Sequence, residues 1–285
     1  MSNRPLPLWL SGAVVGGTFV VLLALELFRP LRRAVEPKRV RLARNFAVAA
    51  LGAAAVSLTE RPVINHLAAS VGERRWGVLG WTSLPLWVEI PLAVALMDYT
   101  LYVWHFLVHR VPWLWRFHVV HHTDLDMDAS TAVRFHFAEL VISIPWRAAQ
   151  VVLIGVSPLD FSIWQTALLV STMFHHSNVR LPETFERRLA RFVVTPRMHG
   201  IHHSVVREET DSNWSSGLAV WDRLHGTFRL DVPQENITIG VPAYRAPEDV
   251  RLASLLRLPF VPQRPSWRWH GTHGTVPRTS ARSDP

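Results

Sequence analysis

The residues best suited to do chemistry in this chain are histidines, which recur in three short clusters. They are His105 and His109, then His118, His121 and His122, then His199, His202 and His203. On a helix, residues three and four apart share a face, so each cluster is predicted to point its imidazoles one way. Neutral imidazole is the commonest protein ligand of transition metals. The spacing therefore predicts a histidine-rich metal site.

The number of histidines indicates two metal ions. Eight imidazoles exceed the capacity of one tetrahedral ion, and burying them without partners would cost roughly a few kcal/mol each. A ninth ligand is predicted in FHHSN, where His176 is the first choice. His175, beside it, is a further candidate whose alternative role is packing.

Two other residues are candidates for supporting the ligands. Asp98 precedes His105 by seven residues, so it shares that helical face and could accept a hydrogen bond from a ligand's second ring nitrogen. The alternative is an ordinary buried or helix-end aspartate. His136 could support the site in the same way, whereas His66 and His225 are expected to be structural.

All-nitrogen coordination does not choose the metal, because zinc, copper and iron all accept imidazole. The chain has no cysteine, which excludes thiolate sites, and no His-Glu-x-x-His zinc motif. The Glu and Glu-x-x-His pattern of soluble di-iron bundles is also missing. Asp124, Asp126 and Asp128 imitate a calcium loop, but Ala129 and Phe135 replace the glycine and glutamate that such a loop needs.

The composition predicts that membrane helices position these histidines. The chain is 49% hydrophobic, only 18% charged, and contains 13 tryptophans, a residue that favours membrane–water interfaces. Its net charge of +8 suits an anionic lipid surface better than nucleic acid in so apolar a chain. Leu8 to Leu25 is long enough to span a bilayer. The basic stretch from Arg29 to Arg44 follows, which predicts a cytoplasmic loop.

Two apolar pairs of segments follow that loop. The first pair is 46–58, which could continue as a kinked segment past Pro62, and 81–97. The second is 140–156 and 161–174, which could form a complete or a re-entrant hairpin. With an external N-terminus, this arrangement brings all three clusters to the cytoplasmic face.

We therefore expect an all-α, multi-pass integral membrane protein with a cytoplasmic, histidine-rich helical cap. Three regions are predicted: an N-terminal transmembrane region (1–92), a catalytic domain that includes the second membrane hairpin (93–230, hairpin 140–174), and a C-terminal extension (231–285). The extension is rich in Pro, Arg, Ser and Thr from about residue 257, which predicts partial disorder there.

At these residues the sequence resembles the fatty acid hydroxylase/sterol desaturase superfamily of integral-membrane, non-haem di-iron enzymes. The resemblance covers roughly residues 93–228, through DYTLYVWHFLVHR, FHVVHH, FHHSNVRLP, TPRMHGIHHS and DSNWSSGLAVWDRLHGTF. It implies that the eight clustered histidines ligate two irons and that His176 matches a further family histidine. Zinc could replace iron in purified protein.

The resemblance also implies the reaction and its partners. A lipid from the bilayer (a sterol, a fatty acyl chain or another isoprenoid) would be hydroxylated or desaturated with O₂. Electrons would come from an external reductase, ferredoxin or cytochrome. Two alternatives stay open: a membrane zinc-dependent hydrolase, in which zinc-bound water attacks an ester, and a non-enzymatic metal-binding membrane protein.

Overall fold

The computed structural model describes residues 4–269, and within this range the chain is helical with no β-strand. Among the described residues, four helical segments are long and apolar enough to cross a membrane: Leu8–Phe28, Lys38–Gly80, Leu86–Arg110 and Phe137–Ile154. The first is α1 (Leu8–Phe28), which ends before Arg29 and Pro30 because the residue preceding a proline is disfavoured in helical geometry.

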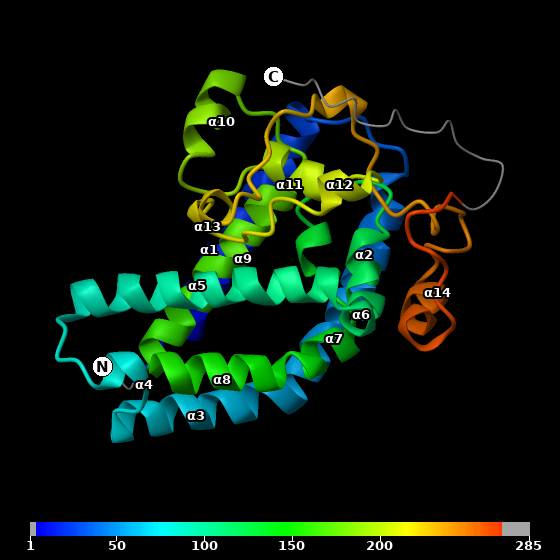
Figure 1. Ribbon diagram of the computed structural model, residues 1–285. Helices are drawn as coiled ribbons and strands as arrows, with labels where there is room; N and C mark the ends of the chain where they lie inside the picture. The colour runs from blue at the N-terminus through cyan, green and yellow to red at the C-terminus, as the bar shows by residue number, and fades with distance from the viewer. Residues whose placement is uncertain (1–3, 270–285) are drawn as a thin grey trace.

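The second candidate span is bent. It consists of α2 (Lys38–Ala55), the π-helical turn η1 (Val56–Glu60), α3 (Arg61–Arg74) and, after a short turn, α4 (Gly77–Gly80). Figure 1 shows the chain changing direction between α2 and α3. The kinked continuation predicted past Pro62 is therefore present, and Pro62 lies in the first turn of α3, where a proline is tolerated.

The next elements carry the first two histidine clusters and the second hairpin. Helix α5 (Leu86–Arg110) is followed by α6 (Pro112–His122), the short turn η2 (Thr131–Val133), α7 (Phe137–Ile142) and α8 (Ile144–Ile154). Helix α9 (Pro158–His176) starts with a capping box in which Ser157 and Asp160 satisfy each other's backbone N–H groups.

The second hairpin extends to the far end of α3. Gly155, with φ +85°, ends α8 against Gly77, with φ +79°, and a Cβ on Gly155 would lie 2.5 Å from the Trp76 carbonyl oxygen. Only glycine allows this approach with a positive φ. The turn between α8 and α9 therefore lies beside the turn between α3 and α4; the first arm, Phe137–Ile154, is a candidate span, whereas α9 is not among the candidates.

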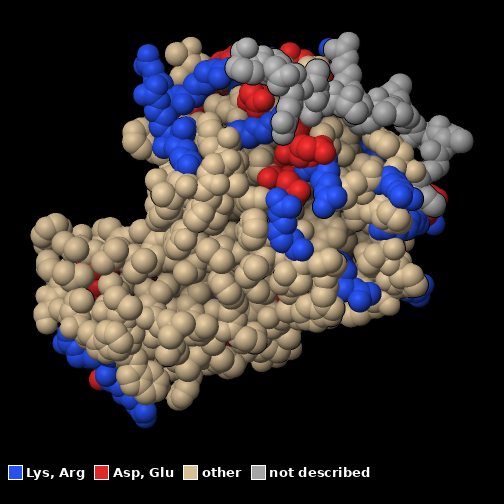
Figure 2. Space-filling model, in the orientation of Figure 1, with Lys and Arg blue, Asp and Glu red and all other residues tan. Residues whose placement is uncertain are grey.

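Apolar packing joins the long helices. Helix α8 lies between α3 and α5, and α9 lies against both α1 and α5 (Figure 1). One apolar core joins α3, α5, α8 and α9 through buried residues that include Ala68, Met97, Val151 and Trp164. Figure 2 shows charged side chains gathered towards one end and at the opposite tip, with a nearly uncharged surface between them. This distribution is that of a membrane protein.

A cap of short helices follows α9. It contains α10 (Glu183–Leu189), α11 (Pro196–His202), α12 (Arg207–Thr210), α13 (Val220–Leu224) and the turn η3 (Gln234–Asn236). Pro196 occupies the first turn of α11, where its missing N–H costs nothing. The helical cap predicted from the sequence is thus present, although loops make up much of it.

Buried ion pairs fix the histidine-bearing α6 to α2. Arg41 lies 2.9 Å from Asp124 and 2.9 Å from Asp128, in the loop that follows α6. Arg134 donates to the Asn45 side chain at 2.7 Å and to the Val120 carbonyl at 3.0 Å. Two of the aspartates that imitate a calcium loop, Asp124 and Asp128, are therefore paired with arginine.

The C-terminal region is more ordered than its composition predicts. Helix α14 (Leu252–Arg257) leads into η4 (Leu258–Phe260), and Leu255 and Leu258 pack with Val119 and Val120 of α6. Trp267 stacks on Trp115, and Ser266 accepts a hydrogen bond from the Trp115 indole at 3.0 Å. The expectation of disorder from about residue 257 is therefore wrong up to residue 269, because these side chains find a hydrophobic surface on α6. Residues 270–285 lie outside the described residues.

Candidate metal centre

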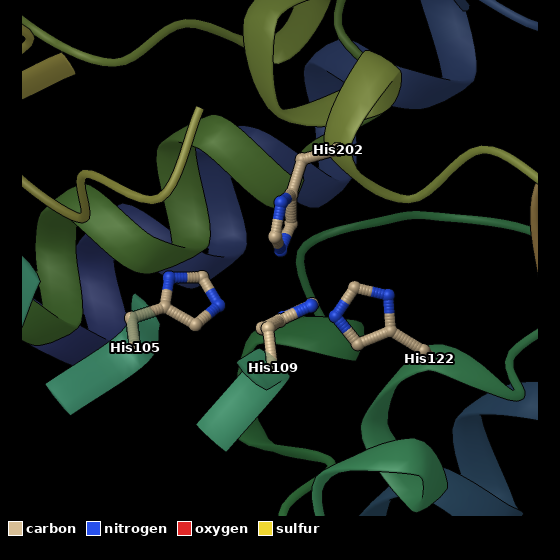
Figure 3. A group of neighbouring side chains, drawn as sticks. All are labelled: His105, His109, His122 and His202. Carbon is tan, nitrogen blue, oxygen red and sulfur yellow. The ribbon is translucent and has the colours of Figure 1, made fainter. Parts of the chain in front are cut away.

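The structure brings the three histidine clusters into one volume and divides them into two groups. The first group is His105 and His109 from α5, His122 from α6 and His202 from α11. Figure 3 shows these four rings converging on a common centre. Their candidate ligand atoms all lie within 4.8 Å of one another.

The second group combines His121 from α6, His176 from α9, and His199 and His203 at α11. The Nε2 atom of His176 lies 3.0 Å from that of His121 and 3.0 Å from that of His199, and the His199 and His203 Nε2 atoms are 3.2 Å apart. Two nitrogens about 2.1 Å from one ion and at right angles to each other would be about 3.0 Å apart. All four side chains are buried.

The sequence pattern explains how two groups arise from three clusters. Adjacent residues on a helix point about 100° apart, so His121 and His122 diverge into different groups, as do His202 and His203. The prediction that each cluster points one way is therefore wrong for these pairs. His121-His122 and His202-His203 each contribute one ligand to each group, and the His122 and His203 rings stack across the boundary at 4.2 Å.

Hydrogen bonds from the protein orient three of the ligands. The Nδ1 atoms of His105, His176 and His202 lie 2.7, 2.8 and 2.8 Å from backbone carbonyl oxygens of Trp214, Thr172 and Ser212. A carbonyl oxygen can only accept, so each Nδ1 carries the proton and each Nε2 keeps its lone pair. This is the tautomer that a metal bound at Nε2 requires.

Unsatisfied nitrogens support a metal at the first group, where Nε2 of His109, His122 and His202 is buried without a hydrogen-bond partner. Nearly all buried polar atoms have a partner, so such a set points to an ion. A donor set made of imidazoles fits zinc, copper or iron.

The electrostatics of the site keep the imidazoles neutral. Burial, together with the nearby His118, lowers the pKa of His202 to about 3, although the hydrogen bond to the Ser212 carbonyl opposes the shift. Burial and neighbouring imidazoles also hold the pKa of His121, His122, His199 and His203 well below the ordinary value of 6.5. Neutral imidazole is the form that binds a metal.

Two of the predicted ligands lie beside the groups instead of within them. The His118 ring lies 4.9 Å from that of His109 and 5.2 Å from that of His121, so it sits between the groups. Its Nε2 is buried without a partner. The His175 ring packs on His199 at 4.0 Å.

Glu139 is a site residue that the sequence reasoning missed. Its Oε1 lies 2.8 Å from His118 Nδ1, and both side chains are buried. The carboxylate accepts a hydrogen bond from the His118 Nδ1–H, which leaves the His118 Nε2 lone pair free, as in carboxylate–histidine pairs around metals. An acidic residue within the apolar stretch after His136 was the signal that could have found it.

Neither residue predicted to support the ligands bonds to one of them. The Asp98 carboxylate accepts from the Leu218 backbone N–H and the Trp221 indole, both at 2.8 Å, and so ties α5 to the cap. His136 Nδ1 accepts from the Ala138 N–H at 3.1 Å and caps α7. Asp98 is turned towards the loop before α13 although it shares a helical face with His105. His136 contributes indirectly, by starting the helix that carries Glu139.

Two single histidines lie away from both groups. His225 stacks on Tyr102 at 5.0 Å, which is a packing role. His66 is exposed on α3.

A cavity of about 460 Å³ connects the histidines to the membrane-facing helices. His121, His176 and His199 line one part of it, and Gly52, Phe135 and Leu168 are among the apolar residues that line the rest. Ser57 and Gln165 line the cavity and are exposed, so it opens beside η1 and α9. An apolar chain could therefore pass from the bilayer to the histidines.

Comparison with known proteins gives concordant results. Residues 90–227 match the family model described as fatty acid hydroxylase. The ornithine lipid hydroxylase OlsE of Rhizobium tropici is 30% identical over 158 residues, which is 55% of this chain and 46% of that protein. Human cholesterol 25-hydroxylase is 28% identical over 54% of this chain and 53% of its own length. Human alkylglycerol monooxygenase is 27% identical over 57% of this chain and 34% of its own length.

The matches with these three relatives thus cover about half or less of each relative's length. No solved structure matches the chain significantly.

Proposed function

Because residues 90–227 belong to the fatty acid hydroxylase/sterol desaturase superfamily, we propose that this protein is a membrane-bound, di-iron lipid oxygenase. It hydroxylates or desaturates a sterol, a fatty acyl chain or another isoprenoid lipid with O₂ and externally supplied electrons. The observation that carries the proposal is the pair of four-histidine groups beside a cavity that opens between membrane helices.

The two histidine groups would hold one iron each, with His118 placed between them. Bound iron supplies the activation of O₂ for attack on an unactivated C–H bond. The protein's own contribution is to hold Nε2 lone pairs inward, through the carbonyls that accept from Nδ1 and through Glu139. The cavity walls guide the apolar chain to the histidines and exclude water from them.

The names of the three relatives describe a hydroxylase or monooxygenase that acts on an ornithine lipid, cholesterol or an alkylglycerol. These names support hydroxylation of a lipid by this chain. They differ in the lipid, so the substrate class proposed here stays broad.

The geometry argues against a zinc hydrolase. Such an enzyme usually keeps an open position on a metal with three protein ligands, together with a nearby acid or base. Here four imidazoles surround each centre, and Glu139 is already hydrogen-bonded to His118.

The proposed orientation places the histidines on the cytoplasmic side. The basic stretch from Arg29 to Arg44 lies on the same side of the molecule as the metal centre, because Arg41 pairs with Asp124 next to α6 and Arg32 donates to Gln234 in the cap. Basic loops are retained in the cytoplasm.

The experiment combines metal analysis with labelled oxygen. Purified protein loaded with iron is given a bilayer lipid extract, reduced ferredoxin and ¹⁸O₂, and the products are analysed by mass spectrometry. We expect iron-dependent and O₂-dependent products: one labelled oxygen atom on a lipid for hydroxylation, or loss of two hydrogens for desaturation. Zinc-loaded protein that hydrolyses an ester without O₂, as fast as iron-loaded protein oxidises lipid, would contradict the proposal.

A further inference from the structure

The cavity carries a charged pair away from the histidines. Glu60, at the end of η1, and Arg147, on α8, both line it and are both largely buried, with side chains 12% and 13% exposed. Ionisable residues inside a membrane are costly, and they usually mark a functional site. The π-helical geometry of η1 is itself enriched at such sites.

The pair lies well inside the membrane-spanning part of the molecule. Arg147 is eight residues before Gly155, where α8 ends against Gly77. At about 1.5 Å per residue this places Arg147 about 12 Å from that end, within a hydrocarbon layer about 30 Å thick. A charge at this depth needs a compensating partner.

The contacts of Arg147 leave hydrogen-bonding capacity unused. Its Nη1 donates to Gln150 Oε1 at 2.8 Å, and the guanidinium lies 4.4 Å from the centre of the Trp164 ring. Its Nε lies 3.8 Å from Glu60 Oε1, which is too long for a hydrogen bond, and has no other partner. The charges of Arg147 and Glu60 therefore balance, but the Arg147 Nε–H donor and the Glu60 carboxylate acceptor lie 3.8 Å apart without a hydrogen bond between them.

We propose that Glu60 and Arg147 bind a hydroxyl group of the lipid substrate; this rests on the proposed function and adds the recognition of the substrate's polar group. A hydroxyl can donate to the Glu60 carboxylate and accept from Arg147 Nε, so one oxygen atom bridges the gap. A charged group would upset the balance of the pair in a low-dielectric site, which favours a neutral group. Arg61, exposed beside the cavity, is the charge that could favour an anion instead.

This binding would set which carbon is oxidised. Glu139, which holds His118, precedes Arg147 by eight residues along α7 and α8. The hydroxyl would therefore be held on the order of 10 Å from the metal centre, by the helical rise per residue. The substrate would enter with its apolar end towards the histidines.

Binding of three matched probes tests the proposal without turnover. Radiolabelled hexadecan-1-ol, hexadecane and hexadecanoic acid share one chain length and differ only at the end. We expect the purified protein to bind the alcohol about tenfold more tightly than the other two, the value of one or two net hydrogen bonds. Equal binding of hexadecane, or tighter binding of the acid, would overturn the proposal on the unmodified protein alone.

A double variant assigns the preference to the pair. Glu60→Leu combined with Arg147→Met removes both charges together and leaves no unpaired ion in the membrane. We expect it to bind hexadecane as before and to lose the preference for the alcohol. Glu73→Gln, exposed on α3, is the control and should keep the preference. A double variant that still prefers the alcohol would exclude the pair.

The two proposals fail separately. Protein that binds the alcohol through the pair but incorporates no labelled oxygen would refute the oxygenase and leave the recognition site standing. Protein that oxidises lipid but binds the alcohol without any contribution from Glu60 and Arg147 would refute the recognition site and leave the oxygenase standing.

Discussion

The Glu139 carboxylate and the His118 imidazole form a buried hydrogen bond of 2.8 Å next to both histidine groups. Removing the acceptor frees the His118 ring to rotate and to change tautomer. Loss of such an outer partner typically lowers metal affinity or activity by about 10- to 100-fold. We therefore expect Glu139→Ala to lower iron content and turnover by that order.

The matched variant is Glu139→Gln, whose side-chain oxygen can still accept from Nδ1. It should keep more iron than Glu139→Ala when both are measured by elemental analysis after dialysis. If both variants kept full iron and full activity, Glu139 would have no part in holding the site.

His121→Ala should affect one metal position more than the other. His121 belongs only to the second group, with His176, His199 and His203. We expect turnover to be abolished and bound iron to fall from about two to about one per chain, while the protein still inserts into membranes. His66→Ala, an exposed histidine on α3, is the control and should keep both metals. Retained activity in His121→Ala would count against His121 as a ligand.

Gly52 should control access through the cavity. It lines the cavity, and a Cβ there would lie 3.0 Å from the Leu140 side chain. Gly52→Leu should fill the passage and lower lipid turnover at least about tenfold without changing iron content. The larger side chain should also lower the free energy of unfolding by about 1–3 kcal/mol through overpacking. Gly12→Leu, on α1, is the control and should leave turnover unchanged, because a Cβ at Gly12 would have no neighbouring atom within 4 Å. Normal turnover in Gly52→Leu would mean that substrate takes another route.

The free energy of unfolding should fall as the pH is lowered below the ordinary pKa of histidine, 6.5. Burial lowers the pKa of His202 to about 3 from an ordinary 6.5, so between these values the unfolded chain takes up a proton that the folded chain does not. The free energy of unfolding then decreases as the pH falls below about 6.5 and is independent of this group above it. Thermal unfolding of purified protein between pH 8 and pH 5 measures this. His202→Asn should make the profile less steep by the share of one group, because buried histidines such as His121 and His199 titrate in the same direction; an unchanged slope would contradict the assignment.

The orientation can be tested with a tag. The cap and the described end of the chain lie on the same side as the basic loop between α1 and α2. A reporter fused to the C-terminus should therefore be protected from external protease in intact cells and become accessible after lysis. Accessibility in intact cells would overturn the proposed topology.

The local sequence determined which residues could bind metal and what kind of elements would carry them. Histidine spacing and long apolar stretches are short-range properties, so the helices, the bent second segment and the hairpin partners could be predicted without a structure. The same reasoning placed Asp98 on the face of His105, and that much is geometrically correct.

Which partner each side chain meets was decided only by the tertiary structure. Asp98 bonds Leu218 and Trp221 because the loop before α13 covers it, while Glu139 reaches His118 because α7 folds back beside α6. The division of His121 and His122 between two centres likewise depends on where α5, α9 and α11 arrive. Helical periodicity fixes the direction of a side chain relative to its own helix axis, but the atoms that the side chain contacts belong to segments distant in the chain.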